Sequence, residues 1–275
     1  MDKGIKLFVT DMDGTLLNSD HKISKENIEA LKELKEKGTE IMVATGRVDT
    51  MVKAYIRQLG LKAPVISCNG GLIRNILTKE TLYINEINRD SILKVLQISK
   101  KYKVPYLIYG EHNVYVDEIT PRVKFFQKYN ETLNDEDRVP IVIVDNINEV
   151  INNEERLIKV LIVCEDDNII KMMGEELSEI EDIVAYKSAK NLFDIMCKGV
   201  SKGNAIKHYA KFKGIKHSEI VAIGDNHNDI SMLDVAGISI AVENAEDVVK
   251  SKADYVAKNN NDHGVAHAIR EYLLY

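Results

Sequence analysis

Short apolar runs that end in a polar turn and lead into a helix constrain this chain more than any other feature. The run IKLFVT (residues 5–10) leads into DMDGT, and the apolar positions of a helix then recur from Ser24 to Gly38. Ser24 fits the N-cap of this helix, and Gly38 lies just past its end. TEIMVAT then predicts a strand, residues 48–59 a helix, and APVISCNGG a third strand. This alternation predicts a parallel sheet with crossover helices.

The same alternation resumes near the end of the chain. GNAIKHYAKFKGI, EIVAIGDN, DISMLDVAG and ISIAV predict helix, strand, helix and strand, followed by ADYVA and the helical tail GVAHAIREYLLY. The middle, about residues 84–191, differs, with a long helix at RDSILKVLQISKKY and strands at PYLIY, NVYVD and LIKVLIVCE. It predicts an inserted α+β domain, in which we expect NETLNDEDRVP to be the most mobile loop.

Charge and composition exclude several classes of partner. The net charge of −6 comes from 37 basic and 43 acidic residues spread along the chain, so no basic stripe predicts nucleic-acid binding. The start lacks a signal-peptide core, and no apolar stretch is long enough to predict a membrane span. Three scattered cysteines fit reduced thiols. We expect a cytoplasmic protein that is a monomer or a weak homo-oligomer.

Oxygen-bearing side chains follow three of the predicted strands: Asp11, Thr45 and Asp225. Ligands of an open parallel sheet bind beyond the carboxyl ends of its strands, so these residues can meet in one crevice. Two carboxylates placed together repel each other unless a cation lies between them, and Mg²⁺ prefers hard oxygen ligands. Asp11 and Asp225 are therefore candidate magnesium ligands. Because a carboxylate can be a covalent nucleophile, Asp11 is also a candidate to form an aspartyl phosphate.

Asp13 and Lys202 complete the candidate catalytic set. Asp13 lies two residues beyond Asp11, where a turn can direct it toward the leaving group, and we expect it to act as general acid and then as general base. Lys202, in the turn VSKGN, is the natural counter-charge for the nucleophile and the phosphoryl oxygens. The Thr45 hydroxyl is a candidate donor to the same oxygens.

Several polar residues have a second, structural reading. DMDGT alone also fits an ordinary Asp-Gly turn, and GDNHND also fits a solvated loop. His263 and His267 are four residues apart, as transition-metal ligands can be, but no third ligand is evident and we expect them to be exposed. Substrate contact and a role in packing or turns fit equally for four residues: Arg47, Asn69, Gly70 and Gly71.

Taken in order, DMDGTLL, ATGR, GVSKGNA and GDNHND resemble motifs one to four of the haloacid dehalogenase superfamily. The tail AVENAEDVVKSKADYVAKNNNDHGVAHAI is similar to that of Cof-type phosphatases, a subclass IIB group. This resemblance spans the chain and implies a Rossmann-like doubly wound core from residues 1–83 and 192–275. It implies an inserted α+β cap at 84–191 that sets substrate specificity. Candidates for that specificity lie near the return to the core: Lys187, Ser188 and Asn191.

The resemblance also implies a role for each motif residue. Asp11 matches the nucleophile and metal ligand, and Asp13 matches the acid/base whose main-chain carbonyl also binds magnesium. Asp225 matches the third protein ligand of the metal. The other matches are phosphate binding by Thr45 and Lys202, a polar contact on the phosphate side by Asn228, support from Asp229, and close backbone approach at Gly14 and Gly46.

The second aspartate narrows the expected activity. Dehalogenases lack an equivalent of Asp13 and transport ATPases read DKTGT at this motif, which leaves phosphatases and phosphomutases. The substrate-binding pattern of phosphomannomutase is not evident in the middle segment. We therefore expect a magnesium-dependent phosphatase that hydrolyses small phosphomonoesters, such as sugar phosphates. The alternatives are a phosphomutase and a non-catalytic module that binds a phosphorylated metabolite.

Overall fold

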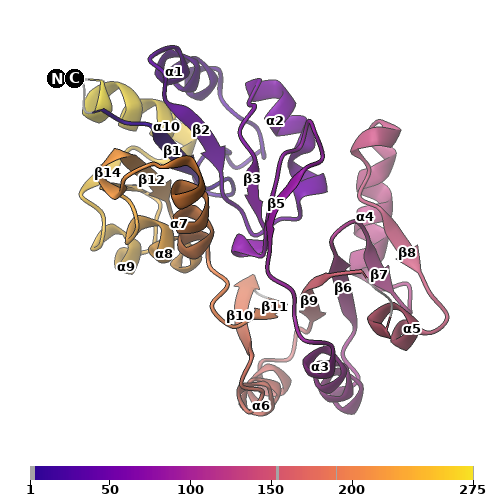
Figure 1. The fold of residues 1–275 in the computed structure, drawn as a ribbon. Coiled ribbons are helices and arrows are strands. Elements are labelled where there is room, and N and C mark those ends of the chain that lie inside the picture. Colours follow the sequence, from indigo (N-terminus) through magenta and orange to yellow (C-terminus); the bar gives the residue numbers. More distant parts are fainter. Residues whose placement is uncertain (1–3, 153–154, 190, 275) are drawn as a thin grey trace. The chain divides into compact units, whose positions relative to one another are not determined.

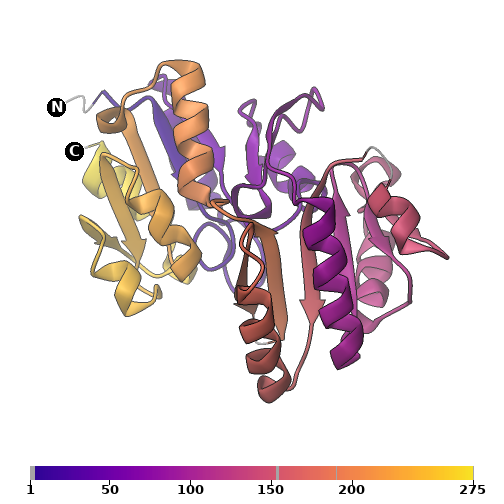
Figure 2. The ribbon, with the colours of Figure 1, turned by 60° about the horizontal axis from the view of Figure 1, so that its bottom comes forward.

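The computed structural model describes residues 4–152, 155–189 and 191–274, which form two compact units (Figures 1 and 2). The first unit combines both ends of the chain, Met1–Leu82 and Ser201–Tyr275. The second is the intervening Tyr83–Val200. We call them the core unit and the inserted unit.

The inserted unit extends further along the chain than the predicted range of 84–191. Strand β11 (Leu192–Cys197), which the prediction placed in the core, pairs antiparallel with β9 (Leu157–Val163) and β10 (Ile183–Ala189). Its neighbours on both sides therefore belong to the inserted unit. The second crossing between the units lies at Val200 and Ser201, where the sequence carries only a short turn.

The core unit is built on a five-stranded parallel sheet with the order β14-β13-β12-β1-β2. Every residue of β1 and β12 is buried, as expected for central strands with helices on both faces. The chain order reverses between these two strands, so right-handed crossovers place the helices that follow them on opposite faces. The predicted doubly wound parallel sheet is confirmed. Its strands are Leu7–Thr10 (β1), Glu40–Val43 (β2), Ile220–Gly224 (β12), Ile238–Val242 (β13) and Tyr255–Ala257 (β14).

The helices of the core unit largely follow the predicted pattern. Ser24 caps the first helix by accepting a hydrogen bond from the Asn27 backbone N–H, as predicted. The helix predicted for residues 48–59 starts instead as a 3₁₀ turn, Asp49–Val52, and continues as α-helix from Lys53. The helical tail ends in a π-helical turn, Ala268–Leu273. The α-helices are Lys25–Glu36 (α1), Lys53–Leu59 (α2), Lys202–Lys213 (α7), Ile230–Leu233 (α8), Asp247–Lys250 (α9) and Gly264–His267 (α10).

A small antiparallel sheet with the order β3-β4-β5 adjoins the second strand of the main sheet. Its strands are Val65–Ser67 (β3), Leu72–Arg74 (β4) and Thr81–Ile84 (β5). A single bridge joins Ala44 to Ile66, and the Thr45 backbone N–H donates to the Ile66 carbonyl at 2.8 Å. This contact places the residues after β3 beside Thr45.

The inserted unit has a six-stranded sheet with the order β10-β11-β9-β6-β7-β8. Its other strands are Tyr106–Gly110 (β6), Val114–Val116 (β7) and Ile141–Ile143 (β8), and its helices are Arg89–Tyr102 (α3), Pro121–Glu131 (α4), Ile147–Asn152 (α5) and Asp167–Ser178 (α6). Apolar side chains of three helices (α3, α5 and α6) share a core with one face of the sheet. Of the described helices, α3 is the longest at 14 residues, and none has the length and apolar character that a bilayer span needs.

The segment predicted to be the most mobile loop of this unit is tied to its surroundings. The first two residues of the segment, 130 and 131, form the end of α4, and its middle contains a 3₁₀ turn, Asp135–Asp137. The Asn130 side chain donates to the Val139 carbonyl at 2.9 Å and accepts from the Val139 N–H at 2.8 Å. Most of the segment is exposed, whereas Asp137 and Val139 are buried.

A buried asparagine joins three parts of the core unit, and we expect its removal to be costly. The Asn27 amide donates to the Leu16 carbonyl at 3.2 Å and accepts from the Ala266 N–H at 2.9 Å. Asn27→Leu should lower the free energy of unfolding by about 1–3 kcal/mol, because two buried backbone groups lose their partner. Urea unfolding measures this. Glu29→Ala, on the exposed side of α1, should stay within about 0.5 kcal/mol of wild type. Equal stability of the two variants would contradict the prediction.

Candidate active site

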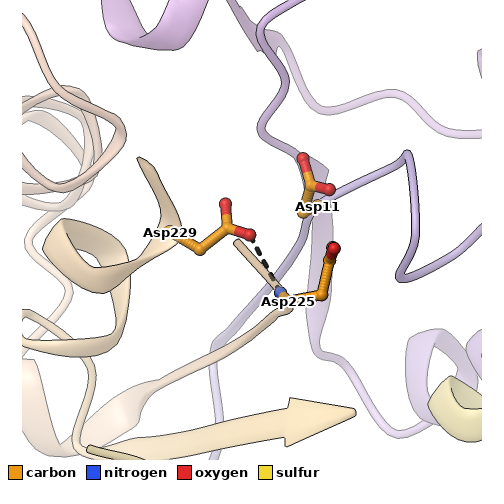
Figure 3. A group of neighbouring side chains, drawn as sticks. All are labelled: Asp11, Asp225 and Asp229. Atoms are coloured by element: carbon orange, nitrogen blue, oxygen red, sulfur yellow. Dashed lines mark hydrogen bonds between the residues drawn. The ribbon is translucent and has the colours of Figure 1, made fainter. Parts of the chain in front are cut away.

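Three aspartates converge at the point where the strand order reverses. Asp11 directly follows β1 and Asp225 directly follows β12, and the Asp11 N–H donates to the Ile223 carbonyl at 3.0 Å. Because β1 and β12 are neighbours, their carboxyl ends bring these two residues together. Asp229 joins them, and one carboxylate oxygen from each of the three lies within 4.8 Å of the others (Figure 3).

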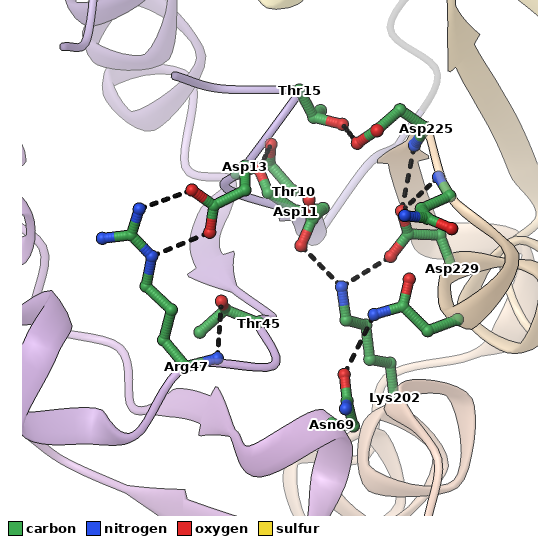
Figure 4. Close-up of polar contacts among 12 residues, drawn as sticks. Thr10, Asp11, Asp13, Thr15, Thr45, Arg47, Asn69, Lys202, Asp225 and Asp229 are labelled. Atoms are coloured by element: carbon green, nitrogen blue, oxygen red, sulfur yellow. Dashed lines mark hydrogen bonds and ion pairs between the residues drawn. The ribbon is translucent and has the colours of Figure 1, made fainter. Parts of the chain in front are cut away.

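Lys202 supplies the positive charge of this cluster. It is the first residue of α7, which Ser201 caps by accepting a hydrogen bond from the Asn204 N–H. Its side chain is fully buried, and Nζ lies 2.5 Å from Asp11 Oδ1 and 2.6 Å from Asp229 Oδ1 (Figure 4). Burial by itself would lower the pKa of Lys202, but the charges of the two aspartates outweigh burial and raise the pKa.

Both carboxylate oxygens of Asp229 accept hydrogen bonds within the protein. One of its oxygens accepts from Lys202, and the other accepts from the backbone N–H groups of Asp225 and Asn226, at 2.9 and 3.0 Å. Both oxygens are therefore already used in fixing the loop after β12 and the lysine. This geometry fits a supporting residue better than a direct metal ligand.

Asp225 is held by the segment that follows Asp11. The buried Thr15 hydroxyl donates to Asp225 Oδ1 at 2.6 Å (Figure 4). Gly14 has φ +81°, and a Cβ there would lie 2.5 Å from Asp225 Oδ2, so only glycine fits. The family resemblance implies the close approach at Gly14, whereas the role of Thr15 is evident only in the structure. The threonine of DMDGT was the available signal, since a hydroxyl beside acidic strand ends can orient a carboxylate.

The carboxylates outnumber the lysine. Burial raises the pKa of Asp11 well above its ordinary value, with the charges of Asp229 and Asp225 adding to this and Lys202 opposing it. Burial likewise raises the pKa of Asp225, to about 6. Both shifts arise mainly from burial, and the neighbouring carboxylates add excess negative charge. A divalent cation would balance it, and the hard oxygen donors present are those that Mg²⁺ prefers.

The residues matched to phosphate binding lie around a second turn. Thr45 is buried; its hydroxyl accepts from the Arg47 N–H at 3.1 Å, and its carbonyl accepts from the Asn69 N–H at 2.9 Å. The exposed Asn228 donates from Nδ2 to Asn69 Oδ1 at 3.0 Å. A Cβ on Gly46 would lie 3.0 Å from the same Asn69 oxygen. Asn69 thus contacts both Thr45 and Asn228. From the sequence pattern alone, substrate contact and a role in packing or turns fitted Asn69 equally.

Asp13 points away from the three aspartates and pairs with Arg47. The guanidinium contacts both carboxylate oxygens of Asp13 (Figure 4). Burial would lower the pKa of Arg47, but the hydrogen bond and charge of Asp13 raise it above its ordinary range. Arg47 therefore keeps its charge and remains an ion-pair partner for Asp13.

Other sequence candidates lie outside this constellation. His263 contacts Glu26 at 3.4 Å and His267 contacts the Tyr255 hydroxyl at 3.3 Å. His263 has φ +61°, so it precedes α10 instead of sharing its face with His267. Among the described residues, the one group with metal-ligand spacing is the aspartate cluster. The side chains of Lys187 and Ser188 lie outside the described part of the chain, and the Asn191 carbonyl accepts from the Cys164 N–H.

Comparisons with known proteins agree with this geometry. A family model described as haloacid dehalogenase-like hydrolase matches residues 8–269. The 5-amino-6-(5-phospho-D-ribitylamino)uracil phosphatase YwtE of Bacillus subtilis (strain 168) is 31% identical, over 98% of this chain and 98% of its own length. The pyridoxal phosphate phosphatase YbhA of Escherichia coli (strain K12) is 26% identical, over 98% and 99%. The solved structure of the subclass IIB sugar phosphatase BT4131 matches with a TM-score of 0.82 at 27% identity, covering 98% of this chain and 100% of that one.

The raised pKa of Asp225 predicts a pH-dependent effect of Asp225→Asn on the metal-free protein. Because burial raises the pKa of the folded-state carboxyl to about 6, its ionisation above that pH opposes folding. At pH 8, Asp225→Asn should therefore raise the free energy of unfolding by about 1–3 kcal/mol. This gain should shrink as the pH falls from 6 toward 4, where the wild-type carboxyl is protonated. Asparagine keeps an acceptor for Thr15.

Urea unfolding in EDTA between pH 8 and pH 4.5 measures this difference. Asp20→Asn, at an exposed position of the same unit, is the matched control and should show no pH-dependent gain. A gain for Asp225→Asn that is as large at pH 5 as at pH 8 would contradict the assignment.

Proposed function

This chain belongs to the haloacid dehalogenase-like hydrolase family and is a Cof-type, subclass IIB phosphatase, and we propose that it hydrolyses small phosphomonoesters by a magnesium-dependent, aspartyl-phosphate mechanism. The observation that carries the proposal is the buried contact between Lys202 and Asp11, beside Asp225, at the carboxyl ends of β1 and β12. A carboxylate in this place is almost fully buried and has a counter-charge at hydrogen-bond distance. Those are the requirements of a nucleophile that attacks an anionic phosphoryl group.

The proposed reaction has two steps that share one acid/base. First, an Asp11 oxygen forms a bond to phosphorus while the bond to the leaving-group oxygen breaks, and Asp13 donates a proton to that oxygen. Water then attacks the phosphorus of the aspartyl phosphate, Asp13 accepts its proton, and Asp11 is regenerated as inorganic phosphate leaves. Lys202, with the Thr45 hydroxyl and the Asn228 amide, would bind the phosphoryl oxygens.

The proposed magnesium site uses residues of both strand ends. The carboxylates of Asp11 and Asp225 and the main-chain carbonyl of Asp13 would hold the ion. When bound, Mg²⁺ neutralises phosphoryl charge and orients the group for in-line attack. Asp229 would support the site by holding Lys202 and the loop that carries Asp225.

The proposed substrate is a sugar phosphate or a related small phosphorylated metabolite. The relatives act, by their names, on a ribitylaminouracil phosphate, on pyridoxal phosphate and on sugar phosphates, so one fold serves several leaving groups. We assign leaving-group selection to the inserted unit, Tyr83–Val200, as the cap. A phosphate-release screen over a metabolite panel with magnesium, ranked by kcat/KM, tests the substrate class.

We also place the protein in the cytoplasm. All three cysteines lie among the described residues, and no disulfide joins them. Reduced thiols are typical of that compartment.

Asp11→Asn should lower phosphatase turnover by at least about 10³-fold, because an amide is a poor nucleophile and a weak magnesium ligand. The variant is isosteric and still offers an oxygen to Lys202, so the fold should be retained. Release of p-nitrophenol from p-nitrophenyl phosphate measures turnover, and circular dichroism checks folding. Magnesium-dependent turnover within tenfold of wild type would exclude Asp11 as the nucleophile.

Magnesium should stabilise the protein through Asp225. At a concentration about tenfold above the dissociation constant, binding contributes about 1.4 kcal/mol, which corresponds to a rise of a few degrees in Tm. Asp225→Ala should abolish this rise, whereas Asp247→Ala, which removes a fully exposed acid, should leave it intact. Thermal unfolding with and without EDTA measures it. Equal magnesium responses in wild type and Asp225→Ala would place the ion elsewhere.

A further inference from the structure

Asp13 and Arg47 form a two-pronged ion pair within the core unit. Arg47 Nε donates to Asp13 Oδ2 at 2.7 Å, and Nη2 of the same guanidinium donates to Oδ1 (Figure 4). The His21 side chain also lies near Asp13 but farther away than Arg47, with Nδ1 3.7 Å from Asp13 Oδ1. Because a guanidinium is planar and its donors are fixed, two parallel bonds define both the position and the orientation of a carboxylate.

The position of Arg47 is itself fixed by its surroundings. Its backbone N–H donates to the Thr45 hydroxyl, and its carbonyl accepts from the Cys68 N–H at 2.9 Å. Cys68 and Asn69 both have left-handed backbones, with φ of 48° and 53°, which is an uncommon conformation that the surrounding contacts must maintain. The guanidinium carbon lies 5.7 Å from the centre of the Tyr55 ring, and the Arg47 side chain is only 17% exposed.

Asp13 depends on this support because it has little packing of its own. Its side chain is 45% exposed, and an exposed aspartate can adopt several rotamers. A general acid must lie within hydrogen-bond reach of the atom that it protonates. We propose that Arg47 is a positioning residue, which fixes the orientation of the Asp13 carboxylate for proton exchange with the leaving group. This inference rests on the proposed function, in which Asp13 exchanges protons with the leaving group and with water.

The competing role for Arg47 is direct binding of the substrate phosphate, since a guanidinium also fits phosphate oxygens. The two roles predict different kinetics. A phosphate ligand contributes to every substrate alike and is lost mainly in KM. A residue that positions the general acid contributes mainly to kcat, and contributes most when the leaving group is poor and needs the proton.

The test compares kcat and KM for 4-nitrophenyl, phenyl and 4-methoxyphenyl phosphate in wild type, Arg47→Ala, Asp13→Ala and the double variant. We expect Arg47→Ala to lower kcat for 4-methoxyphenyl phosphate by about 10- to 100-fold, because a misplaced catalytic group loses about this much. The loss for 4-nitrophenyl phosphate should be less than about threefold, with KM nearly unchanged. In the Asp13→Ala background, Arg47→Ala should have less than about a twofold effect. Arg47→Lys, which keeps the charge but loses the fork, should restore part of kcat.

Arg270→Ala is the matched control, because it removes another arginine–carboxylate pair of the core unit, with Glu33. It should leave the dependence on the leaving group unchanged. The inference is overturned if Arg47→Ala lowers kcat/KM equally for all three esters through KM, or if its effect persists in the Asp13→Ala background. Failure of the proposed function looks different, since wild type itself would then release no phosphate with magnesium.

Discussion

The core unit holds one lysine ammonium, fully buried, beside three aspartates. The close approach of the elements that carry these residues depends on this interaction. Lys202 Nζ lies 2.5 Å from Asp11 and 2.6 Å from Asp229, and its side chain has no exposed surface. An unpaired buried charge would cost several kcal/mol, so β1, β12 and the start of α7 must meet closely. Gly203 reflects this demand, because a Cβ there would lie 2.0 Å from the Ser231 carbonyl oxygen of α8. Burial raises the pKa of Asp225 to about 6, and the charge of Asp229 adds to this shift.

Locally unfavourable backbone gathers around the same point. Gly14 adopts a positive φ so that Asp225 can approach it, and the turn after β3 places Cys68 and Asn69 in the left-handed region. Such conformations persist only where surrounding contacts compensate for them. In this turn the Cys68 N–H donates to the Arg47 carbonyl, and the Asn69 side chain accepts from the Asn228 side chain. The left-handed turn therefore contacts two residues that we assign to catalysis.

Chemistry and leaving-group selection fall into separate units in our proposal. Every residue with a proposed role in phosphoryl transfer belongs to the core unit, whereas the inserted unit has its own sheet and its own hydrophobic core. A unit with an independent core can vary in sequence without disturbing the aspartate cluster. The relatives, which are named for different phosphorylated compounds yet match over nearly the whole chain, are consistent with such a division.

By itself, the sequence determined the alternation of strands and helices, and hence that Asp11, Thr45 and Asp225 would stand at strand ends on one edge of a parallel sheet. The spacing of apolar residues and the end of a strand are local properties, so they can be predicted from the sequence. It did not determine that β11 belongs to the inserted unit, because an apolar strand shows its partner only through backbone pairing. Nor did it determine that Thr15 would hold Asp225 or that Arg47 would hold Asp13. Those contacts join residues 210 and 34 positions apart, and only the packed tertiary structure brings such side chains within hydrogen-bond distance.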